Sequence, residues 1–183
     1  MGSSRQGRKG LAVGNWVRRH AEERFEVDFV DLQTLGLPFF NEPLSPFSMK
    51  REGKAYVHPE GRAWADRVAR AQAVLLVTPE YNHGYPGVLK NALDWVGPEW
   101  VDKPVAFISY SSTATGGARA VEQLRQVVVE VGLVQVANAI HIPRIAEAFS
   151  GDEPANPQTN EALGKMFNEL ERLHGALANA TAG

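Results

Sequence analysis

Residues 74–95 have the sequence VLLVTPEYNHGYPGVLKNALDW, and this stretch predicts the fold. It begins with a short aliphatic and β-branched run, which is typical of a strand buried on both faces. A Pro-Glu-Tyr-Asn turn follows at residues 79–82. Pro86 suits the first turn of a helix, and the apolar residues after it recur at helical spacing. In open α/β sheets, ligands bind at the carboxyl ends of the strands, so this turn is the first candidate site.

The rest of the chain alternates between the same two kinds of pattern. The patterns predict helices at about residues 11–24, 60–70, 87–96, 118–131 and 160–178, and strands at residues 25–32, 71–78, 105–110 and 134–142. Residues 33–58 and 143–157 are expected to be irregular, and the aromatic content of the first argues against plain disorder. Gly132 is placed to end the helix before it. Such alternation predicts an α/β fold with a parallel sheet between two layers of helices, in a single domain of residues 1–183.

The composition is that of an ordinary globular protein, with 44% hydrophobic and 22% charged residues and a formal charge of −2. This charge is too small to indicate a nucleic-acid or membrane partner. No apolar run is long enough for a membrane span, and the start does not have the pattern of a signal peptide. A cytoplasmic location is expected, because the absence of cysteine fits a reducing compartment. The absence of cysteine excludes disulfides, thiolate nucleophiles and Cys-ligated metals. The five histidines lack paired metal-ligand spacing, so no metal site is expected.

Residues 1–10 are rich in glycine, serine and basic residues, and they lead directly into the first predicted helix. Backbone N–H groups at a helix start, with hydroxyls and Arg nearby, make an anion site. The spacing of Gly2 and Gly7 is like that of a nucleotide-phosphate loop, but such a loop continues with Lys and a hydroxyl residue. Here Arg8-Lys9 follow, so we exclude an ATPase or GTPase and favour a phosphate monoester bound without metal. The alternative is a solvated basic segment.

Three stretches together resemble the NADPH-dependent FMN reductase family, flavodoxin-like proteins that include azoreductases and quinone or chromate reductases. Residues 2–8 (GSSRQGR) resemble the family's phosphate loop, and residues 79–95 resemble its flavin-ring motif with the helix behind it. The loop of residues 109–117 resembles its third flavin contact. The middle motif is long and specific, whereas the other two are short. The resemblance runs from residue 1 to about residue 142 and implies a flavodoxin-like three-layer sandwich.

The resemblance implies non-covalently bound FMN, with NADPH as the hydride donor. The contacts that it implies are Ser3, Ser4, Arg5 and Arg8 for the FMN phosphate, Pro79, Glu80, Tyr81 and Asn82 for the ring edge, and Ser111, Gly116 and Gly117 for the pyrimidine end. The chemistry belongs to the flavin, so no catalytic nucleophile or general base is expected from the protein. The alternatives are a strand-end turn with Tyr81 packed on the core and a flexible glycine loop.

The resemblance further implies reduction of quinones, azo compounds, free flavin or metal oxyanions by a ping-pong mechanism, in a homodimer or homotetramer. One alternative is a non-catalytic, flavodoxin-like electron carrier. Carriers of that kind tend to be strongly acidic for docking, and this chain is not. Another alternative is a regulatory α/β domain without flavin, in which the glycine-rich turns are incidental. The physiological acceptor and the preference between NADH and NADPH stay open.

The chain departs from the family pattern at its start. Family members have a central strand before the Gly-Ser loop, whereas here Met1 stands where that strand would end. Loss of a central strand would remove the burial of roughly five or six apolar side chains, on the order of 10 kcal/mol. The whole stability of a domain is about 5–15 kcal/mol. We therefore expect the functional protein to carry further residues upstream of Met1, and the intact mass of the native protein would test this.

Overall fold

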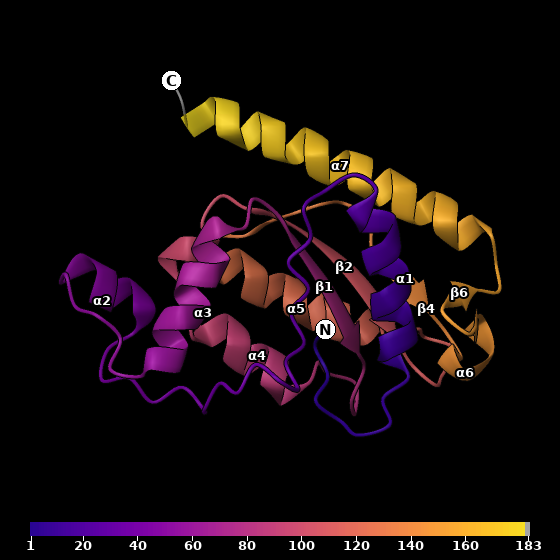
Figure 1. Ribbon diagram of the computed structural model, residues 1–183, viewed down its shortest axis with the longest axis horizontal. Helices are drawn as coiled ribbons and strands as arrows, with labels where there is room; N and C mark the ends of the chain where they lie inside the picture. The colour runs from indigo at the N-terminus through magenta and orange to yellow at the C-terminus, as the bar shows by residue number, and fades with distance from the viewer. Residues whose placement is uncertain (182–183) are drawn as a thin grey trace.

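The structure is a computed structural model that describes residues 1–181 (Figure 1). Its described residues form a four-stranded parallel sheet made of β1 (Val74–Pro79), β2 (Pro104–Tyr110), β3 (Val134–Gln135) and β4 (Ile140–Ile142). β2 is central, because β1 pairs along one of its edges while β3 and β4 follow one another along the other. The predicted parallel sheet is confirmed.

The last predicted strand is broken into β3 and β4. The break falls at residues 136–139, where the N–H of Val136 still donates to the carbonyl oxygen of Val105 at 2.9 Å. Asn138 is exposed, and its side chain donates to Glu169 at 3.0 Å instead of lying in a regular strand. Asn is disfavoured in strands, which gives a local reason for the interruption.

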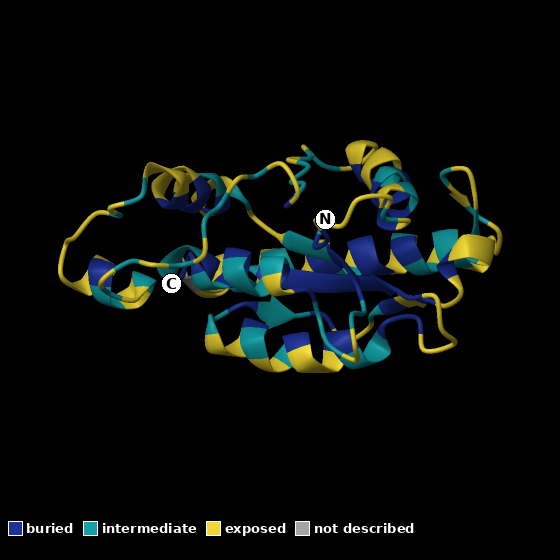
Figure 2. Ribbon diagram, turned by 90° about the horizontal axis from the view of Figure 1, so that it is seen from below, coloured by how far each residue is buried: buried dark blue, intermediate teal, exposed yellow. Residues whose placement is uncertain are grey.

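Helices cover both faces of the sheet, as the alternating pattern predicted (Figures 1 and 2). The covering helices are α1 (Gly10–Glu22) and α7 (Gln158–Thr181) on one face, and α3 (Pro59–Arg70), α4 (Gly87–Asp94) and α5 (Ala118–Glu130) on the other. Side chains alternate along β2, so Ala106 and Ile108 pack under α1 and α7 while Phe107 packs on the opposite side. Figure 2 shows the sheet as a buried layer between helices whose outer sides are exposed.

The end of α5 follows from local sequence. Gly132 has a φ of +87°, which glycine adopts without the steric penalty of a side chain. Its N–H donates to the carbonyl oxygen of Val129 at 3.1 Å, and the N–H of Leu133 donates to that of Val128 at 2.9 Å. These two bonds form a Schellman motif, so the predicted helix stop at Gly132 is confirmed.

Residues 25–32 do not form the predicted strand within the described part of the chain. The N–H of Leu32 donates to the carbonyl oxygen of Met1 at 3.2 Å, and the N–H of Gly2 donates to that of Val77 at 2.7 Å. The Met1–Gly2 peptide therefore lies between this segment and β1. The alternating residues still pack, since Phe25 and Val27 contact the core under α1 and α7. The pattern predicted the packing correctly, but a strand also needs a continuous ladder of backbone partners.

The two segments that were expected to be irregular contain short elements. Residues 33–58 contain α2 (Pro46–Arg51), and residues 143–157 contain α6 (Ile145–Ala148) and the antiparallel strands β5 (Phe149–Ser150) and β6 (Glu153–Pro154). A 3₁₀ turn, η1 (Pro98–Trp100), follows α4. Ser45 caps α2 by accepting the N–H of Ser48, with Pro46 at the first helical position. Within residues 1–181, every helix is too short or too polar to cross a membrane.

Candidate functional site

The carboxyl ends of the parallel strands lie at one edge of the sheet, and three loops meet there. β1 leads into the middle turn (residues 79–86), and β2 leads into the third loop (residues 111–117). The N-terminal loop (residues 3–9) enters α1 beside them, since Gly2 is hydrogen-bonded to Val77 of β1 (Figure 1). The fold therefore brings all the predicted site residues to the same edge.

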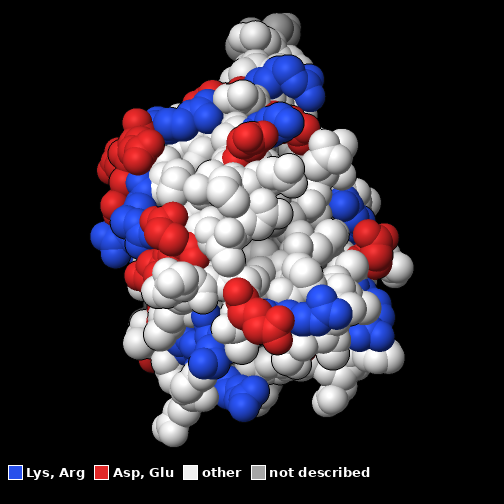
Figure 3. Space-filling view, turned by 90° about the vertical axis from the view of Figure 1, so that its right-hand side faces the viewer, with Lys and Arg blue, Asp and Glu red and all other residues white. Residues whose placement is uncertain are grey.

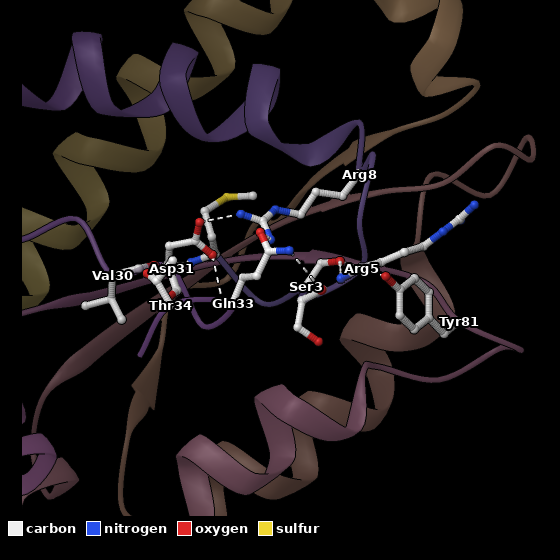
Figure 4. A network of polar contacts seen from close by, with 10 residues as sticks. Ser3, Arg5, Arg8, Val30, Asp31, Gln33, Thr34 and Tyr81 are labelled. Atoms are coloured by element: carbon white, nitrogen blue, oxygen red, sulfur yellow. Dashed lines mark hydrogen bonds and ion pairs between the residues drawn. The ribbon is translucent and has the colours of Figure 1, made fainter. Parts of the chain in front are cut away.

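Ser3 and Tyr81 join the N-terminal loop to the middle turn (Figure 4). Ser3 is fully buried, and its hydroxyl oxygen lies 2.7 Å from that of Tyr81. The N–H of Arg5 also approaches the Ser3 hydroxyl, at 3.4 Å. Tyr81 is half-buried, so its phenol makes a polar contact across two loops as well as packing on the protein.

Arg8 is turned inward and paired. Its side chain is 4% exposed, and its guanidinium forms an ion pair with Asp31 and donates to the side-chain oxygen of Gln33. Gln33 in turn donates to the carbonyl oxygen of Ser4 at 3.3 Å. Arg8 thus ties the N-terminal loop to residues 31–33, a role that the sequence did not predict. The Nε of Arg8 is buried and has no hydrogen-bond partner among residues 1–181, and its contact with a phosphate stays a prediction.

Ser4 and Arg5 are exposed, and the guanidinium of Arg5 points away from the Arg8 network (Figure 4). The helix behind them begins at Gly10 with Lys9 as the preceding residue. In the described part of the chain, no side chain caps this helix start, and its first turn has no acidic residue. The partial positive charge of the α1 N-terminus is therefore uncompensated.

A hollow of about 330 Å³ borders the start of α1. Its walls include Arg8, Lys9 and Ala12 on the α1 side and Ile145, Ala146 and Phe149 on the α6 side. Figure 3 shows the right-hand side of Figure 1, where α6 and β6 lie, and charged side chains of both signs surround a wide uncharged area there. The hollow is therefore lined by basic and apolar residues at the start of α1 and by apolar residues at α6 and β5.

The middle turn is a tight hairpin held in a strained conformation. The N–H of Tyr81 donates to the carbonyl oxygen of Gly84 at 2.8 Å, and the N–H of Gly84 donates to the carbonyl oxygen of Tyr81 at 2.9 Å. Asn82 and His83 between them have φ values of +50° and +70°, which non-glycine residues rarely adopt. The side chain of Gln123 on α5 donates to the His83 carbonyl oxygen at 2.9 Å and supports this shape. Strain of this kind concentrates at functional sites.

Arg119 joins the middle turn to the third loop. Its Nε donates to Glu80 at 2.7 Å, and a terminal nitrogen approaches the hydroxyl of Thr115 at 3.4 Å. The Glu80 side chain is 4% exposed, and its second oxygen has no hydrogen-bond partner among the described residues. Sequence reasoning missed Arg119, although one signal was present. A cation in the first turn of a helix opposes the helix dipole, so Arg119 at the second position of α5 needed a local partner.

The third loop is held by backbone and hydroxyl contacts. The buried Ser109 hydroxyl donates to the carbonyl oxygen of Gly116 at 2.8 Å, and the Ser111 hydroxyl donates to that of Thr113 at 3.1 Å. Gly116 has a φ of +61°, and a methyl group added there would lie 2.9 Å from the backbone nitrogen of Ile142. The predicted glycine loop is therefore closely packed against β4.

His141 supports the same loop from β4. Its Nδ1 lies 2.7 Å from the Ser109 hydroxyl, whose single hydrogen is directed at Gly116. Both contacts are satisfied together when Nδ1 carries a proton and donates to Ser109. Burial lowers the pKa of His141, and the nearby Arg125 lowers it further, while Glu122 has the opposite, smaller effect.

The N-terminal loop fits an anionic group. Two buried donors near the start of α1, the Nε of Arg8 and the hydroxyl of Tyr110, have no hydrogen-bond partner within residues 1–181. Buried polar groups are normally paired, so unpaired donors beside an uncapped helix start favour an acceptor bound there. A phosphate supplies charge and several acceptor oxygens, so these residues fit the phosphate end of FMN. In the described chain, no group of side chains could hold a metal ion.

Both the family model and the individual relatives that match this chain are FMN or quinone reductases. The model of the NADPH-dependent FMN reductase family matches residues 1–147. An NAD(P)H-dependent FMN reductase of Schizosaccharomyces pombe is 32% identical over 179 residues, which cover 94% of this chain and 87% of that protein. A 2-hydroxy-1,4-benzoquinone reductase of a Burkholderia species is 36% identical, with 73% of this chain and 70% of that protein covered.

Solved structures are similar as well. FerB, a flavoenzyme NAD(P)H:(acceptor) oxidoreductase from Paracoccus denitrificans, superimposes with a TM-score of 0.77 at 27% identity, over 95% of this chain and 94% of that one. An FMN-dependent NADH-azoreductase from Bacillus anthracis, solved in complex with FMN, gives a TM-score of 0.54 at 14% identity, over 97% and 93% of the two chains. The second likeness shows the fold alone, and the flavodoxin-like α/β prediction is confirmed.

Proposed function

Because this chain belongs to the NADPH-dependent FMN reductase family, we propose that it takes hydride from NAD(P)H and reduces small quinones in a ping-pong order. FMN, when bound, accepts the hydride and returns two electrons to the acceptor, so the protein has to bind and orient the reactants. The quinone class is favoured by the 36% identical 2-hydroxy-1,4-benzoquinone reductase. Azo compounds, free flavin and metal oxyanions are further candidate acceptors.

One observation carries the proposal: three loops far apart in sequence are bonded to one another at the carboxyl edge of the sheet. Ser3 contacts Tyr81 at 2.7 Å, and Arg119 links Glu80 to the third loop. This edge is where parallel α/β sheets bind ligands. In a regulatory domain without flavin, the same contacts would only stabilise the loops, and the glycine-rich turns would be incidental.

We propose that each loop holds one part of FMN. Ser3, Ser4, Arg5 and Arg8 would hold the phosphate, the backbone of residues 79–82 would meet the ring edge, and Ser111, Gly116 and Gly117 would meet the pyrimidine end. Glycine at positions 116 and 117 allows φ values of +61° and +89° and the close packing of this loop on β4 and Ser109. N–H groups there would stabilise negative charge on the ring, as they do for other anions. Each of these contacts is a proposal about this chain's own residues.

The exposed aromatic segment supports a homodimer or homotetramer as part of the proposal. Phe39 is 84% exposed and Val57 is 71% exposed, both between Leu32 and α3. Contiguous exposed apolar patches are typical of association surfaces, and we propose that these side chains belong to one. Light scattering after size-exclusion chromatography should give at least twice the 20.0 kDa chain mass, and a monomer would contradict this part. We also propose a cytoplasmic location.

The experiment is a turnover screen of purified, FMN-loaded protein. NADPH and NADH are each tested with a benzoquinone, an azo dye, chromate and free FMN. We expect fastest oxidation of the nicotinamide with the quinone, and parallel lines in double-reciprocal plots. Intersecting lines would contradict the ping-pong order, and a faster reaction with another acceptor would contradict the quinone assignment. Protein that binds FMN but turns over neither nucleotide would be a carrier, contrary to the proposal.

A further inference from the structure

Tyr110 is a buried residue beside the candidate site, and sequence analysis did not identify it as a site residue. It is the last residue of β2 and is 4% exposed. Its hydroxyl is buried and lacks a hydrogen-bond partner within the described chain. A buried hydroxyl without a partner is unfavourable, so its persistence needs an explanation. Ser3 and Tyr81, by comparison, satisfy one another.

The Tyr110 hydroxyl lies against the first residue of α1. A methyl group added to Gly10 would be 2.0 Å from the Tyr110 oxygen, so the glycine leaves the space that the phenol occupies. α1 has 13 residues, and among residues 1–181 no side chain caps its start. The unpaired hydroxyl therefore lies beside the first turn of a helix whose N-terminus is of the kind that binds phosphate.

The surroundings of Tyr110 keep its hydroxyl protonated, so that it can donate a hydrogen bond. Burial raises the pKa of the Tyr110 hydroxyl well above its usual value, and the neighbouring Tyr81 raises it further. A contact with the Ser3 side chain and the charge of Arg8 oppose this rise less strongly. The Ser3 contact does not reach hydrogen-bond geometry, since the Ser3 hydroxyl is bonded to Tyr81 and the Tyr110 hydroxyl has no partner within residues 1–181. Tyr110 is therefore protonated at neutral pH and has a hydrogen to give. The Nε of Arg8, the second unpaired buried donor, belongs to the same neighbourhood.

We infer that Tyr110 is a further cofactor-binding residue, whose hydroxyl donates a hydrogen bond to the phosphate of FMN. The inference rests on the proposed function, because it presumes that the N-terminal loop holds that phosphate. Tyr110 comes from β2 rather than from the loop, so it approaches the phosphate from the sheet side of the helix start. Binding of FMN would satisfy a donor that the protein leaves unpaired.

The test is Tyr110→Phe, which removes the hydroxyl and keeps the ring that packs in the core. Protein freed of flavin is titrated with FMN and with riboflavin, which lacks the phosphate, and binding is followed by flavin fluorescence. We expect the Kd for FMN to rise about tenfold, which corresponds to about 1.4 kcal/mol, while the Kd for riboflavin changes less than twofold. Tyr56→Phe is the matched control, because Tyr56 packs beside Trp95 in the opposite core and should leave both constants unchanged.

Thermal unfolding gives a second readout. Without flavin, Tyr110→Phe should unfold at the same temperature as the wild type or a few degrees higher, because an unpaired buried hydroxyl is removed. Saturating FMN should then raise the midpoint less in the variant than in the wild type. An unchanged Kd for FMN, or an equal loss for both flavins, would overturn the inference. A wild-type protein that binds neither flavin would overturn the proposed function itself.

Discussion

The third loop and the N-terminal loop lie at the same edge of the sheet but are held in different ways. In the third loop, the Gly116 carbonyl and the Ser111 hydroxyl both have partners. At the N-terminal loop, the Tyr110 hydroxyl and the Nε of Arg8 have none among residues 1–181. The end proposed for the flavin ring is therefore organised in advance, which lowers the entropy lost on binding. The end proposed for the phosphate keeps unpaired donors, so its hydrogen bonds form when the ligand binds.

The largest expected change in stability comes from replacing one of two glycines that have nearly the same backbone conformation. Gly116 has a φ of +61° and Gly7 a φ of +64°, so alanine is strained to a similar degree at both. At Gly116 the new methyl would lie 2.9 Å from a backbone nitrogen, whereas at Gly7 no atom lies within 4 Å. We expect Gly116→Ala to lower the free energy of unfolding by about 3 kcal/mol or more, and Gly7→Ala by about 1 kcal/mol. Urea denaturation measures both values.

The same pair should differ in flavin binding. Gly116→Ala displaces the third loop and should abolish measurable FMN binding, while Gly7→Ala should retain it with a moderate loss. Equal effects of the two substitutions on stability would show that the third loop is not packed more tightly than the N-terminal loop.

The next effect concerns the contact between the middle turn and the third loop. Arg119→Met leaves the buried carboxylate of Glu80 without its cation, and we expect a loss of about 2 kcal/mol in the free energy of unfolding. Glu80→Gln keeps an acceptor for Arg119 and should lose about 1 kcal/mol. A double variant should lose less than the sum of the single losses, because the two side chains are in contact. A larger loss for Glu80→Gln than for Arg119→Met would contradict the buried position of the carboxylate.

A smaller effect is expected at the bond between the N-terminal loop and the middle turn. Ser3→Ala removes the partner of the Tyr81 hydroxyl, which should lower the free energy of unfolding by about 1 kcal/mol. Ser4→Ala changes an exposed side chain and should stay within about 0.5 kcal/mol of the wild type. Both are measured by denaturation without flavin, so that ligand contacts do not contribute. A Ser3→Ala protein as stable as Ser4→Ala would show that this bond does not hold the loops together.

The smallest effect is a pH dependence at the third loop. The pKa of His141 is lowered in the folded protein, so the unfolded chain binds this proton at higher pH than the folded one. Wild-type stability should therefore fall as the pH drops from about 6.5 through the lowered pKa of His141. Above about pH 6.5, His141 is neutral in both states and does not change the stability with pH. His141→Gln should lose less stability than the wild type over this range. A steeper acid loss in the variant, measured by urea denaturation at each pH, would contradict the burial argument.

Most of the helices and the parallel sheet could be predicted because their signals are local. The spacing of apolar residues identified α1, α3, α4, α5 and α7, and the buried runs identified β1 and β2. The prediction at residues 25–32 was wrong for a physical reason. Alternation reports which side chains are buried, whereas a strand also depends on neighbours that supply backbone hydrogen bonds.

The candidate site could be placed from the sequence, but its side-chain contacts could not. The turn at residues 79–82 and the two glycine-rich loops follow strands or precede a helix, so topology places them together. Arg119 was missed because it acts through a contact between segments far apart in the chain, and the proposed contact of Tyr110 depends on packing of the same kind. Arg8 was predicted as a contact to the FMN phosphate, and the fold also pairs it with Asp31, 23 residues away, which the sequence did not indicate.

The sequence by itself determined the α/β architecture, the edge of the sheet where the candidate site lies and the family to which the chain belongs. These depend on periodicity, turn residues and motifs, all of which are short-range properties of the chain. Tertiary structure alone decided which polar groups are paired. The hydroxyls of Ser3 and Tyr81 meet across 78 residues, while the hydroxyl of Tyr110 is buried without a partner in the described chain. Pairing depends on distances of a few ångströms between remote segments, and sequence spacing does not contain that information.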